Sequence, residues 1–402
     1  MNERAPTLAG GGARSAVPAI LFAHSGAELY GADRILLELT AGLQARGHGL
    51  QVVLPGPGPL HAELARLGVV THRKNLGVLR RRYFTPRGLI NRLCRVVRAV
   101  GFMRGLLRQH GIGVVHSNTT AVFSGVLAAR LAGVPHVWHV HEITTRPRWF
   151  ARAMAACVGL LSQRAVFVSQ ATLEHMCALN PRVRAKAVVI HNGIDPGRAL
   201  DGRRGVLRAE MGWAPDQPVV GMVGRINWWK GQTKLLECAL LLAPRHSQLR
   251  WLMVGGTYDG DNRARDELLA GIARHSMATA VQVLDFREDV GNVLADLDVF
   301  VLPSTEPDPF PTVVLEAMAA ARPIVAFRHG GVCEMVEDGV SGLLCTPGSA
   351  AEMAAAIERL VSDPELRLRM GQAARQRVMS LFTREAFVQR FSALYVELAA
   401  GR

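Results

Sequence analysis

Cysteine is scarce and dispersed in this chain of 402 residues. The six cysteines form no C-x-x-C pair, which argues against a structural zinc site and against a disulfide framework. The same pattern favours a reducing compartment, so we expect a cytoplasmic protein. The cysteines are Cys94, Cys157, Cys177, Cys238, Cys333 and Cys345.

Long apolar runs are also missing. No uninterrupted run approaches the ~18 residues that a helix needs to span a bilayer. Residues 1–17 are rich in Gly and Ala and lack the apolar block of a signal peptide, so we expect them to form a disordered tail. The composition, 49% hydrophobic and 20% charged, is typical of a globular protein, and the length suits two domains.

Acidic residues are absent from one long stretch, because none occurs between Glu63 and Glu142. Residues 1–195 hold 24 Lys and Arg against 8 Asp and Glu, whereas residues 196–402 hold 23 against 25. One interpretation is that the first half is attracted to an anionic membrane face or to a phosphate-bearing acceptor. The other is an arginine-rich surface that reflects coding bias and needs no partner. The sequence leaves both open.

The pattern of the chain predicts an α/β protein. Short apolar strands alternate with helical patterns, which indicates parallel sheets covered on both faces. We expect two Rossmann-like, doubly wound lobes with a cleft between them: residues 18–195, a linker at 196–217, and residues 218–383, with a final helix at 384–402 that packs back toward the first lobe. The predicted strands are Ala19–Ser25, Leu50–Leu54, Gly113–Asn118, His136–His141, Ala165–Ser169, Ala187–His191, Val219–Val223, Leu249–Val254, Val281–Phe286, Val299–Leu302 and Ile324–Phe327.

One predicted helix, over residues 89–107, is both basic and amphipathic. Its apolar positions follow helical spacing, and arginines fall mainly on its other faces. Such helices can lie in a membrane interface. We favour the interpretation that the apolar stripe packs on the sheet and the arginines face water, while membrane contact through the arginines stays open. The apolar positions are Leu93, Val96, Val97, Val100, Met103 and Leu107; the arginines are Arg92, Arg95, Arg98 and Arg108, preceded by Arg80, Arg81 and Arg82.

The most informative segment follows the strand Val299–Leu302. A proline-stiffened loop carries Asp308, and a helix predicted to open at Thr312 carries Glu316 one turn inside. Ligands of open α/β sheets bind at the carboxyl ends of strands, and a helix start offers unpaired N–H groups to an anion. Two acids and free amides suit a polyhydroxylated, phosphorylated ligand such as a nucleotide-sugar.

Two cations follow another strand of the same lobe. Arg225 and Lys230 lie five residues apart across a strand-to-helix turn, which permits both to converge on one anion. A guanidinium offers two contacts to phosphate oxygens and an ammonium a compact charge, so the pair would stabilise a departing diphosphate. Ordinary surface cations are the alternative for this motif taken alone.

The first lobe contributes a glycine loop around Gly31 and a His-x-His pair, His139 and His141, at the end of a strand where the cleft should be. A glycine lets the backbone approach a ligand, although a plain tight turn has the same signal. A histidine there can hydrogen-bond a sugar or assist proton transfer. No further ligand completes a metal set nearby, so we expect no metal. The nicotinamide fingerprint G-x-G-x-x-G is absent, which disfavours a dehydrogenase.

Two other acidic features have structural interpretations. Asp296-Leu297-Asp298 has the form of a metal-binding Asp-x-Asp, but it directly precedes an apolar strand and is read as a strand-edge feature. Glu334 follows Gly330-Gly331 in a loop that opens toward the cleft, and we expect it to cap the helix beginning near Val332.

Taken together and in order, these segments resemble the retaining glycosyltransferases of the GT-B type, in their large family four. The resemblance runs over nearly the whole chain, through "YGADRILLEL", "VVHSNTT", "HVHEI", "VIHNGID", "GRINWWKG", "DVFVLPS", "DPFPTVVLEAMAAARPIVA" and "GGVCEMVEDGVSGLL". The resemblance implies that Gly31 lies near the donor diphosphate, His141 touches the transferred sugar, and Arg225 and Lys230 bind the diphosphate. It further implies that Asp308 contacts the sugar hydroxyls and Glu316 holds the donor ribose.

The chain departs from the family pattern in three places. Asp308 is one methylene shorter than the usual Glu, and Glu306 is a possible substitute for it. Pro311 replaces a glycine and removes one N–H, which leaves Phe310, Thr312 and Val313 as backbone donors. Tyr30 replaces the first glycine of the first loop. These changes bear on sugar preference more than on activity.

The sequence therefore predicts a metal-independent, retaining hexosyltransferase-type enzyme without a cofactor, whose substrate is a nucleoside-diphosphate-sugar. The second lobe would bind the donor and the basic first lobe a glycan or polyprenyl-linked acceptor, in cell-surface polysaccharide assembly, with peripheral contact to the inner face of the cell membrane and no nucleic acid. Alternatives on the same architecture are a sugar-nucleotide epimerase or phosphorylase, or a catalytically silent nucleotide-sugar-binding subunit.

Overall fold

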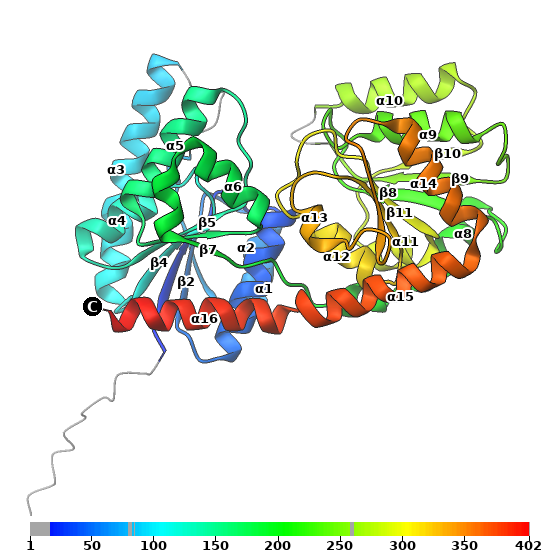
Figure 1. The fold of residues 1–402 in the computed structure, drawn as a ribbon. Helices are drawn as coiled ribbons and strands as arrows, with labels where there is room; N and C mark the ends of the chain where they lie inside the picture. The colour runs from blue at the N-terminus through cyan, green and yellow to red at the C-terminus, as the bar shows by residue number, and fades with distance from the viewer. Residues whose placement is uncertain (1–16, 79–82, 84, 258–260, 402) are drawn as a thin grey trace, which may run out of the picture.

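The computed structural model describes residues 17–78, 83, 85–257 and 261–401. It contains two lobes, each built on a parallel β-sheet with helices on both faces (Figure 1). The α/β class and the two doubly wound, Rossmann-like lobes predicted from the sequence are confirmed. Arg80, Arg81, Arg82 and nearly all of the predicted tail lie outside the described residues.

The first sheet has the strand order β3-β2-β1-β4-β5-β6-β7 and the second the order β10-β9-β8-β11-β12-β13 within the described residues. In both, the order reverses beside the first strand of the lobe, which is where open α/β sheets leave a crevice. The strands are β1 Ile20–Ala23, β2 Leu50–Leu54, β3 Val70–Arg73, β4 Val114–Ser117, β5 His136–Val140, β6 Arg164–Phe167, β7 Ala187–Val189, β8 Val219–Val223, β9 Arg250–Val254, β10 Val281–Leu284, β11 Val299–Leu302, β12 Ile324–Phe327 and β13 Gly342–Cys345.

Helices connect the strands and cover the sheets. In the first lobe they are α1 Gly31–Ala45, α2 Pro59–Arg66, α3 Pro86–Gln109, α4 Phe123–Ala132, α5 Arg148–Leu161, α6 Gln170–Leu179 and the 3-10 helix η2 Pro181–Lys186. From there to the C-terminus they are α7 Gly197–Leu200, α8 Val206–Met211, α9 Gln232–Leu242, α10 Arg263–Arg274, α11 Val290–Asp296, α12 Thr312–Ala319, α13 Val332–Met335, α14 Ala350–Ser362, α15 Pro364–Leu381 and α16 Arg384–Ala400.

Every strand predicted from the sequence is present, with ends within two residues. Strands β3 and β13 have no counterpart in the prediction. β3 is an edge strand with the sequence Val-Thr-His-Arg and no buried residue, so its apolar signal is weak. β13 is only four residues long and begins with a glycine. Short or polar edge strands carry little periodicity, because sheet pairing rather than side-chain burial defines them.

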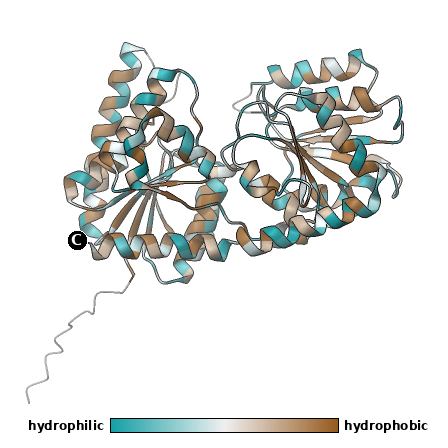
Figure 2. Cartoon of the chain, in the orientation of Figure 1, coloured by the Kyte–Doolittle hydropathy of each residue, from teal (hydrophilic) through white to brown (hydrophobic). Residues whose placement is uncertain are grey.

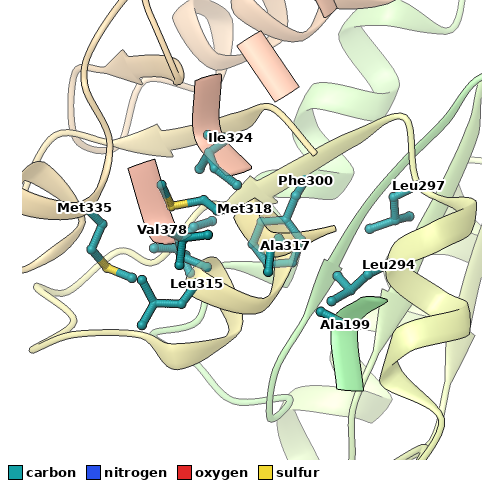
Figure 3. Packing of buried hydrophobic residues seen from close by; sticks show 14 of the residues in the cluster. Ala199, Leu294, Leu297, Phe300, Leu315, Ala317, Met318, Ile324, Met335 and Val378 are labelled. Atoms are coloured by element: carbon teal, nitrogen blue, oxygen red, sulfur yellow. The ribbon is translucent and has the colours of Figure 1, made fainter. Parts of the chain in front are cut away.

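Apolar strands form the centre of each lobe, between helices that turn their polar sides outward (Figure 2). In the second lobe the helix that carries Glu316, α12, packs its buried Leu315 and Met318 into a cluster that includes Phe300 and Ile324 of the sheet (Figure 3). This packing anchors α12, whose first turn faces the interlobe cleft. Rigid placement of that turn is the structural basis of the site described below.

The chain crosses between the lobes twice. After α15 it returns to the first lobe, where α16 packs against α1 (Figure 1). At the crossing, the Ile194 N–H donates to the carbonyl of Phe382, and the Arg384 N–H donates to the carbonyl of Ile194, both at 3.0 Å. Residues 196–217, expected as a linker, include α7 and α8, which pack against α11 of the second lobe.

The basic helix α3 differs from its predicted placement. Only the C-terminal part of the apolar stripe, including Val100 and Met103, is buried, whereas Leu93 and Val97 are 64% and 62% exposed. Arg92, expected in water, is buried, with its guanidinium over the Tyr83 ring. The stripe therefore does not pack on the sheet along its whole length. None of the described helices combines the length and apolar character that crossing a bilayer requires.

Candidate active site in the cleft between the lobes

A cavity of about 860 Å³ opens between the lobes at the carboxyl ends of their strands. Residues from both lobes line it, and they include every site residue predicted from the sequence apart from His139. Those from the first lobe are Gly31 and His141; those from the second are Arg225, Lys230, Asp308, Phe310, Thr312, Val313 and Glu316. The structure thus brings these nine residues to one cavity, while the role of each stays a prediction.

The acidic loop has the predicted geometry. Helix α12 begins at Thr312, directly after Pro311, so Glu316 lies one turn inside it. The glycine pair Gly330-Gly331 closes on the loop from the next strand connection. A Cβ on Gly330, which has φ +67°, would lie 2.4 Å from the carbonyl oxygen of Asp308, and the Gly331 N–H donates to that oxygen at 2.8 Å. These glycines hold the backbone of Asp308 in place.

The cationic loop is held against the acidic loop. Gly231, which precedes α9, has φ +80°, and a Cβ there would lie 1.8 Å from the carbonyl oxygen of Pro303. The Thr305 N–H donates to the carbonyl of Trp229 at 2.8 Å. As a result the Lys230 ammonium reaches the Oδ2 atom of Asp308 at 2.5 Å, with both side chains largely buried. The two predicted ligand-binding groups are therefore paired with each other.

Arg225 meets the first lobe across the cavity. Its guanidinium carbon lies 4.6 Å above the centre of the Tyr30 ring, a distance at which cation–π attraction operates. Tyr30 directly precedes α1, and its N–H donates to Oδ2 of Asp33 at 3.0 Å. Tyr30, which replaces a glycine of the family's loop, therefore contacts Arg225, the residue predicted to bind the diphosphate. At Gly31 a Cβ would meet nothing within 4 Å, so the space beside it is open.

The two histidines of the His-x-His pair have different positions. His141 lines the cavity, whereas His139 is fully buried behind it, with its ring centre 3.9 Å from that of His141. The expectation that both face the cleft is wrong for His139, because His139 lies within β5 whereas His141 follows the last residue of that strand. Burial lowers the pKa of His141 to about 3, so this ring is neutral at physiological pH.

Glu334 has a different role from the predicted one. It lies within α13, but its carboxylate crosses the cleft and accepts from the N–H groups of Gln170 and Ala171 at 2.8 and 2.9 Å. These are the first residues of α6 in the other lobe. His191 is 2.7 Å from the same carboxylate and stacks on Phe310. Glu334 therefore caps a helix of the opposite lobe and links the two halves of the molecule.

Comparison with known proteins identifies the family. The model "Glycosyltransferase Family 4" matches residues 29–198, and "Glycosyl transferases group 1" matches residues 204–377. An alpha-maltose-1-phosphate synthase of Mycobacterium tuberculosis is 32% identical over 295 residues, which cover 67% of this chain and 75% of that protein. This chain belongs to the group 1 glycosyltransferases.

Two further relatives are informative for this glycosyltransferase. The lipopolysaccharide core biosynthesis glycosyltransferase LpsE of Rhizobium meliloti is 31% identical over 214 residues, covering 53% of this chain and 58% of that protein. The crystal structure of Anabaena HepE in complex with UDP and glucose superimposes with a TM-score of 0.81 at 25% identity, covering 94% of this chain and 99% of that one. The similarity confirms the predicted GT-B fold.

The aspartates of the Asp-x-Asp segment serve the scaffold of the glycosyltransferase. Asp296 is fully buried and accepts from the N–H groups of Gly205, Leu207 and Arg208, the start of α8. Asp298 accepts from the Val219 N–H at 2.9 Å and from the Arg208 guanidinium at 2.8 Å. The interpretation of this segment as a feature at a strand edge holds for Asp298, and Asp296 is a helix cap.

Sequence reasoning missed several residues of the cavity wall. Trp228 is 73% exposed, follows the strand that ends at Val223, and lines the cavity. Glu142 lines it as well and accepts hydrogen bonds from the hydroxyls of Thr119 and Thr120. Burial raises the pKa of Glu142 despite these bonds. The double tryptophan and the Glu after the His-x-His pair were visible signals, but neither has a spacing that indicates a ligand.

Proposed function

We propose that this glycosyltransferase moves a hexose-type unit from a nucleoside-diphosphate-sugar to a glycan or lipid-linked acceptor with retention of anomeric configuration and without a metal. The observation that carries the proposal is the shared cavity of Arg225, Lys230, Asp308 and Glu316. Two cations and two carboxylates at strand ends match a ligand that combines a diphosphate with sugar hydroxyls.

Arg225 and Lys230 would bind the diphosphate as negative charge develops on it during cleavage of the bond to the sugar. Positive groups already fixed in place before the reaction stabilise that charge with little reorganisation. Lys230 is preorganised by Asp308 and Arg225 by its position over Tyr30. The first turn of α12 adds the N–H groups of Thr312 and Val313 near the same region. The two side-chain cations would supply the charge that a metal ion supplies in other transferases.

Asp308 would accept hydrogen bonds from hydroxyls of the transferred sugar, and Glu316 would accept from the ribose. The complex of HepE with UDP and glucose supports a uridine diphosphate donor as the first to test. Phe286 and Arg287, which follow β10, also line the cavity and would lie beside the base. Polysaccharide or lipopolysaccharide assembly is proposed as the setting from the relation to LpsE.

The donor proposal is tested with a panel of nucleoside-diphosphate-sugars, first by thermal shift and then by release of the nucleoside diphosphate. Consumption of donor only when an acceptor glycan or lipid is present supports a transferase, whereas conversion without acceptor supports an epimerase. Binding with no turnover under any acceptor supports a silent subunit. Proton NMR of the first-formed product decides retention against inversion, and unchanged rates in a chelator support metal independence.

We also propose peripheral contact of the first lobe with an anionic membrane face. The N-terminal half of α3 exposes Leu89, Ile90, Leu93 and Val97, and Arg98 and Arg87 are exposed beside them. Figure 1 shows α3 on the side of the first lobe away from the second. Apolar side chains flanked by arginines suit the boundary between headgroups and acyl chains, and each surface cation adds about 1 kcal/mol of attraction. A lipid-linked acceptor would then reach the first lobe from the membrane.

A further inference from the structure

A buried polar cluster lies directly behind the cavity, at the end of β4. Its centre is Asn118, which is fully buried. The amide oxygen of Asn118 lies 3.3 Å from Nε2 of His116, 3.2 Å from Nδ1 of His139 and 3.3 Å from Nε2 of His141. One side chain therefore contacts three imidazole rings, of which only that of His141 reaches the cavity.

The orientation of the Asn118 amide follows from its other contact. Its nitrogen lies 3.3 Å from the carbonyl oxygen of Ala32, and a carbonyl oxygen only accepts hydrogen bonds. The NH₂ group must face Ala32, so the amide oxygen faces the three histidine rings. A ring nitrogen that hydrogen-bonds to that oxygen must then carry a proton, since an oxygen and an unprotonated nitrogen have no hydrogen to share, and the three rings share the two lone pairs of the oxygen.

The rest of the cluster agrees with this assignment. The same NH₂ group lies 3.1 Å from Nδ1 of His24, which must accept, so His24 carries its proton on Nε2 and donates it to Asp33 at 2.6 Å. His116, protonated on Nε2, is left with an accepting Nδ1, and the Tyr395 hydroxyl lies 2.6 Å from it. The hydrogen-bond directions are consistent from the Tyr395 hydroxyl on α16 to Asp33 at the start of α1, and Nε2 of His139 is the buried ring nitrogen of this cluster that has no hydrogen-bond partner among the described residues.

For His141 the consequence is a fixed tautomer. Nε2 carries the proton and donates a hydrogen bond to the amide oxygen of Asn118, so Nδ1 carries the lone pair. A neutral ring in this state can accept a hydrogen bond from a molecule in the cavity but cannot donate one. Burial keeps the ring neutral, as the lowered pKa of His141 indicates. A ligand group that faces His141 must therefore bring its own hydrogen.

We propose that Asn118 is a positioning residue that sets the tautomer of His141, and that His141 selects a donor sugar with a hydroxyl at the position facing it. The selection rests on the proposed function. A hydroxyl donates to Nδ1, whereas a carboxylate or carbonyl at the same place would set two lone pairs against each other and lose the contact. The site accordingly favours neutral hexoses over uronic acids of the same stereochemistry.

The tautomer is measured on the ligand-free wild-type protein labelled with ¹⁵N-histidine. Long-range ¹H–¹⁵N correlation at pH 7 reports which ring nitrogen carries the proton, and His141→Gln assigns the signal. We expect the Nε2–H form in the wild type and a mixture of tautomers in Asn118→Leu, which keeps the branched shape of the side chain without its hydrogen bonds. An Nδ1–H or doubly protonated His141 in the wild type overturns the inference whether or not the variant folds.

A double-mutant cycle on donor turnover tests the link to His141. Asn118→Leu should lower kcat/KM by about two- to tenfold in the wild type, in line with the loss of one oriented hydrogen bond between neutral groups. It should have little further effect in His141→Ala, because the group it positions is gone. If the effects of Asn118→Leu and His141→Ala on kcat/KM multiply in the double variant, Asn118 has a general structural role and the inference is contradicted. Equal use of a neutral hexose donor and its uronic acid by the wild type would contradict the selection.

The proposed function and the positioning role of Asn118 can be contradicted independently. If no nucleoside-diphosphate-sugar is turned over but the Nε2–H tautomer depends on Asn118, the proposed function falls and the positioning role stands. If transfer is observed but the tautomer is different, the positioning role falls and the proposed function stands.

Discussion

The ammonium nitrogen of Lys230 lies 2.5 Å from Oδ2 of Asp308, although the two residues belong to loops that follow different strands. Side-chain exposure is 16% for Lys230 and 9% for Asp308, so the pair is formed in a largely dry part of the cavity. A diphosphate that binds here would meet a cation whose position is already set. Asp308 would be left oriented toward the sugar next to that diphosphate.

We expect Lys230→Ala and Arg225→Ala to lower kcat/KM by about 10²–10³ each, which is the range for removal of one preorganised group that stabilises developing charge. The measurement is steady-state release of nucleoside diphosphate. The matched control is Lys234→Ala, which removes another lysine of the same lobe whose ammonium pairs with Glu237 at 2.8 Å outside the cavity. Wild-type rates in both cavity variants would show that Arg225 and Lys230 do not stabilise the departing diphosphate.

Asp308 and Glu306 are the two candidates for the carboxylate that contacts the hydroxyls of the transferred sugar. Asp308 is buried, its backbone is held by Gly330 and Gly331, and it pairs with Lys230. Glu306 also lines the cavity but is only half-buried. We therefore expect Asp308→Ala to reduce kcat by orders of magnitude and Glu306→Ala to change it by less than about fivefold. The reverse order of effects, measured with saturating donor, would assign the role to Glu306.

The sequence predicted this part of the molecule well, because strand, loop and helix signals are local. The apolar run of β11, the prolines and the helix start at Thr312 together define where Asp308 and Glu316 lie. Pairings that depend on tertiary structure were not predictable in this way. In the sequence, Glu334 stands where it could cap the helix that begins near Val332. Only the approach of the two lobes places its carboxylate at the N–H of Gln170 instead.

The same distinction explains the errors on α3 and the His-x-His pair. Helical spacing identifies an apolar stripe correctly, but the length of the stripe that is covered depends on neighbouring elements that periodicity does not describe. His139 and His141 are two residues apart and therefore lie on the same side of β5, so only the exact end of the strand, which periodicity does not fix, decides that His139 is buried and His141 lines the cavity.

The buried histidines predict acid lability of the first lobe. Burial lowers the pKa of His116, His136 and His141 to about 3 each. Between the unfolded pKa of about 6.5 and the folded pKa of about 3, these histidines are protonated in the unfolded chain but not in the folded lobe. The free energy of unfolding therefore falls as the pH falls through this window. At pH 5 the loss is about 2 kcal/mol for each histidine, and the sum is comparable to the stability of a domain.

We expect amide hydrogen exchange, corrected for its intrinsic pH dependence, to show loss of protection in the first lobe at a higher pH than in the second. His136→Gln removes one titrating group beside Ser117 and should move the transition to lower pH. The control is His275→Gln, at an exposed position after α10. Simultaneous loss of protection in both lobes, or a first lobe that stays protected at pH 4, would contradict the prediction.

Glu334 is expected to stabilise the contact between the lobes. Burial raises the pKa of Glu334, but the hydrogen bonds from His191 and from the backbone N–H groups outweigh this and hold the pKa below its ordinary value. The group is therefore charged at pH 7, where bonds to a charged acceptor are worth about 1.5–3 kcal/mol. Glu334→Gln should lower the Tm and speed exchange of the amides of Gln170 and Ala171, which it leaves without a charged acceptor.

Glu352→Gln is the control for this experiment. Its carboxylate accepts from the Thr346 N–H at 3.1 Å within the second lobe, so the substitution makes the same chemical change without touching the other lobe. Unchanged exchange at residues 170 and 171 in Glu334→Gln would show that another interaction holds the start of α6.

Vesicle binding by the exposed half of α3 can be divided experimentally into an electrostatic and an apolar contribution. Binding to vesicles of neutral lipid should be weak, and binding should rise with the fraction of anionic lipid and fall with salt, because the arginines act over about a Debye length. Ile90→Ser with Leu93→Ser removes two side chains that are each 64% exposed, so the fold should keep its stability while co-sedimentation drops at every lipid composition. Arg98→Glu should lower binding mainly at high anionic content.

The matched control is Leu269→Ser with Arg274→Glu, which changes one exposed apolar and one exposed cationic side chain on α10 of the second lobe. This pair should leave co-sedimentation unchanged if α3 is the contact surface. If both sets of variants lose binding equally, attraction follows from net charge alone and α3 is not the contact surface. Binding that does not depend on anionic lipid would instead point to a soluble acceptor and an arginine-rich surface without a membrane partner.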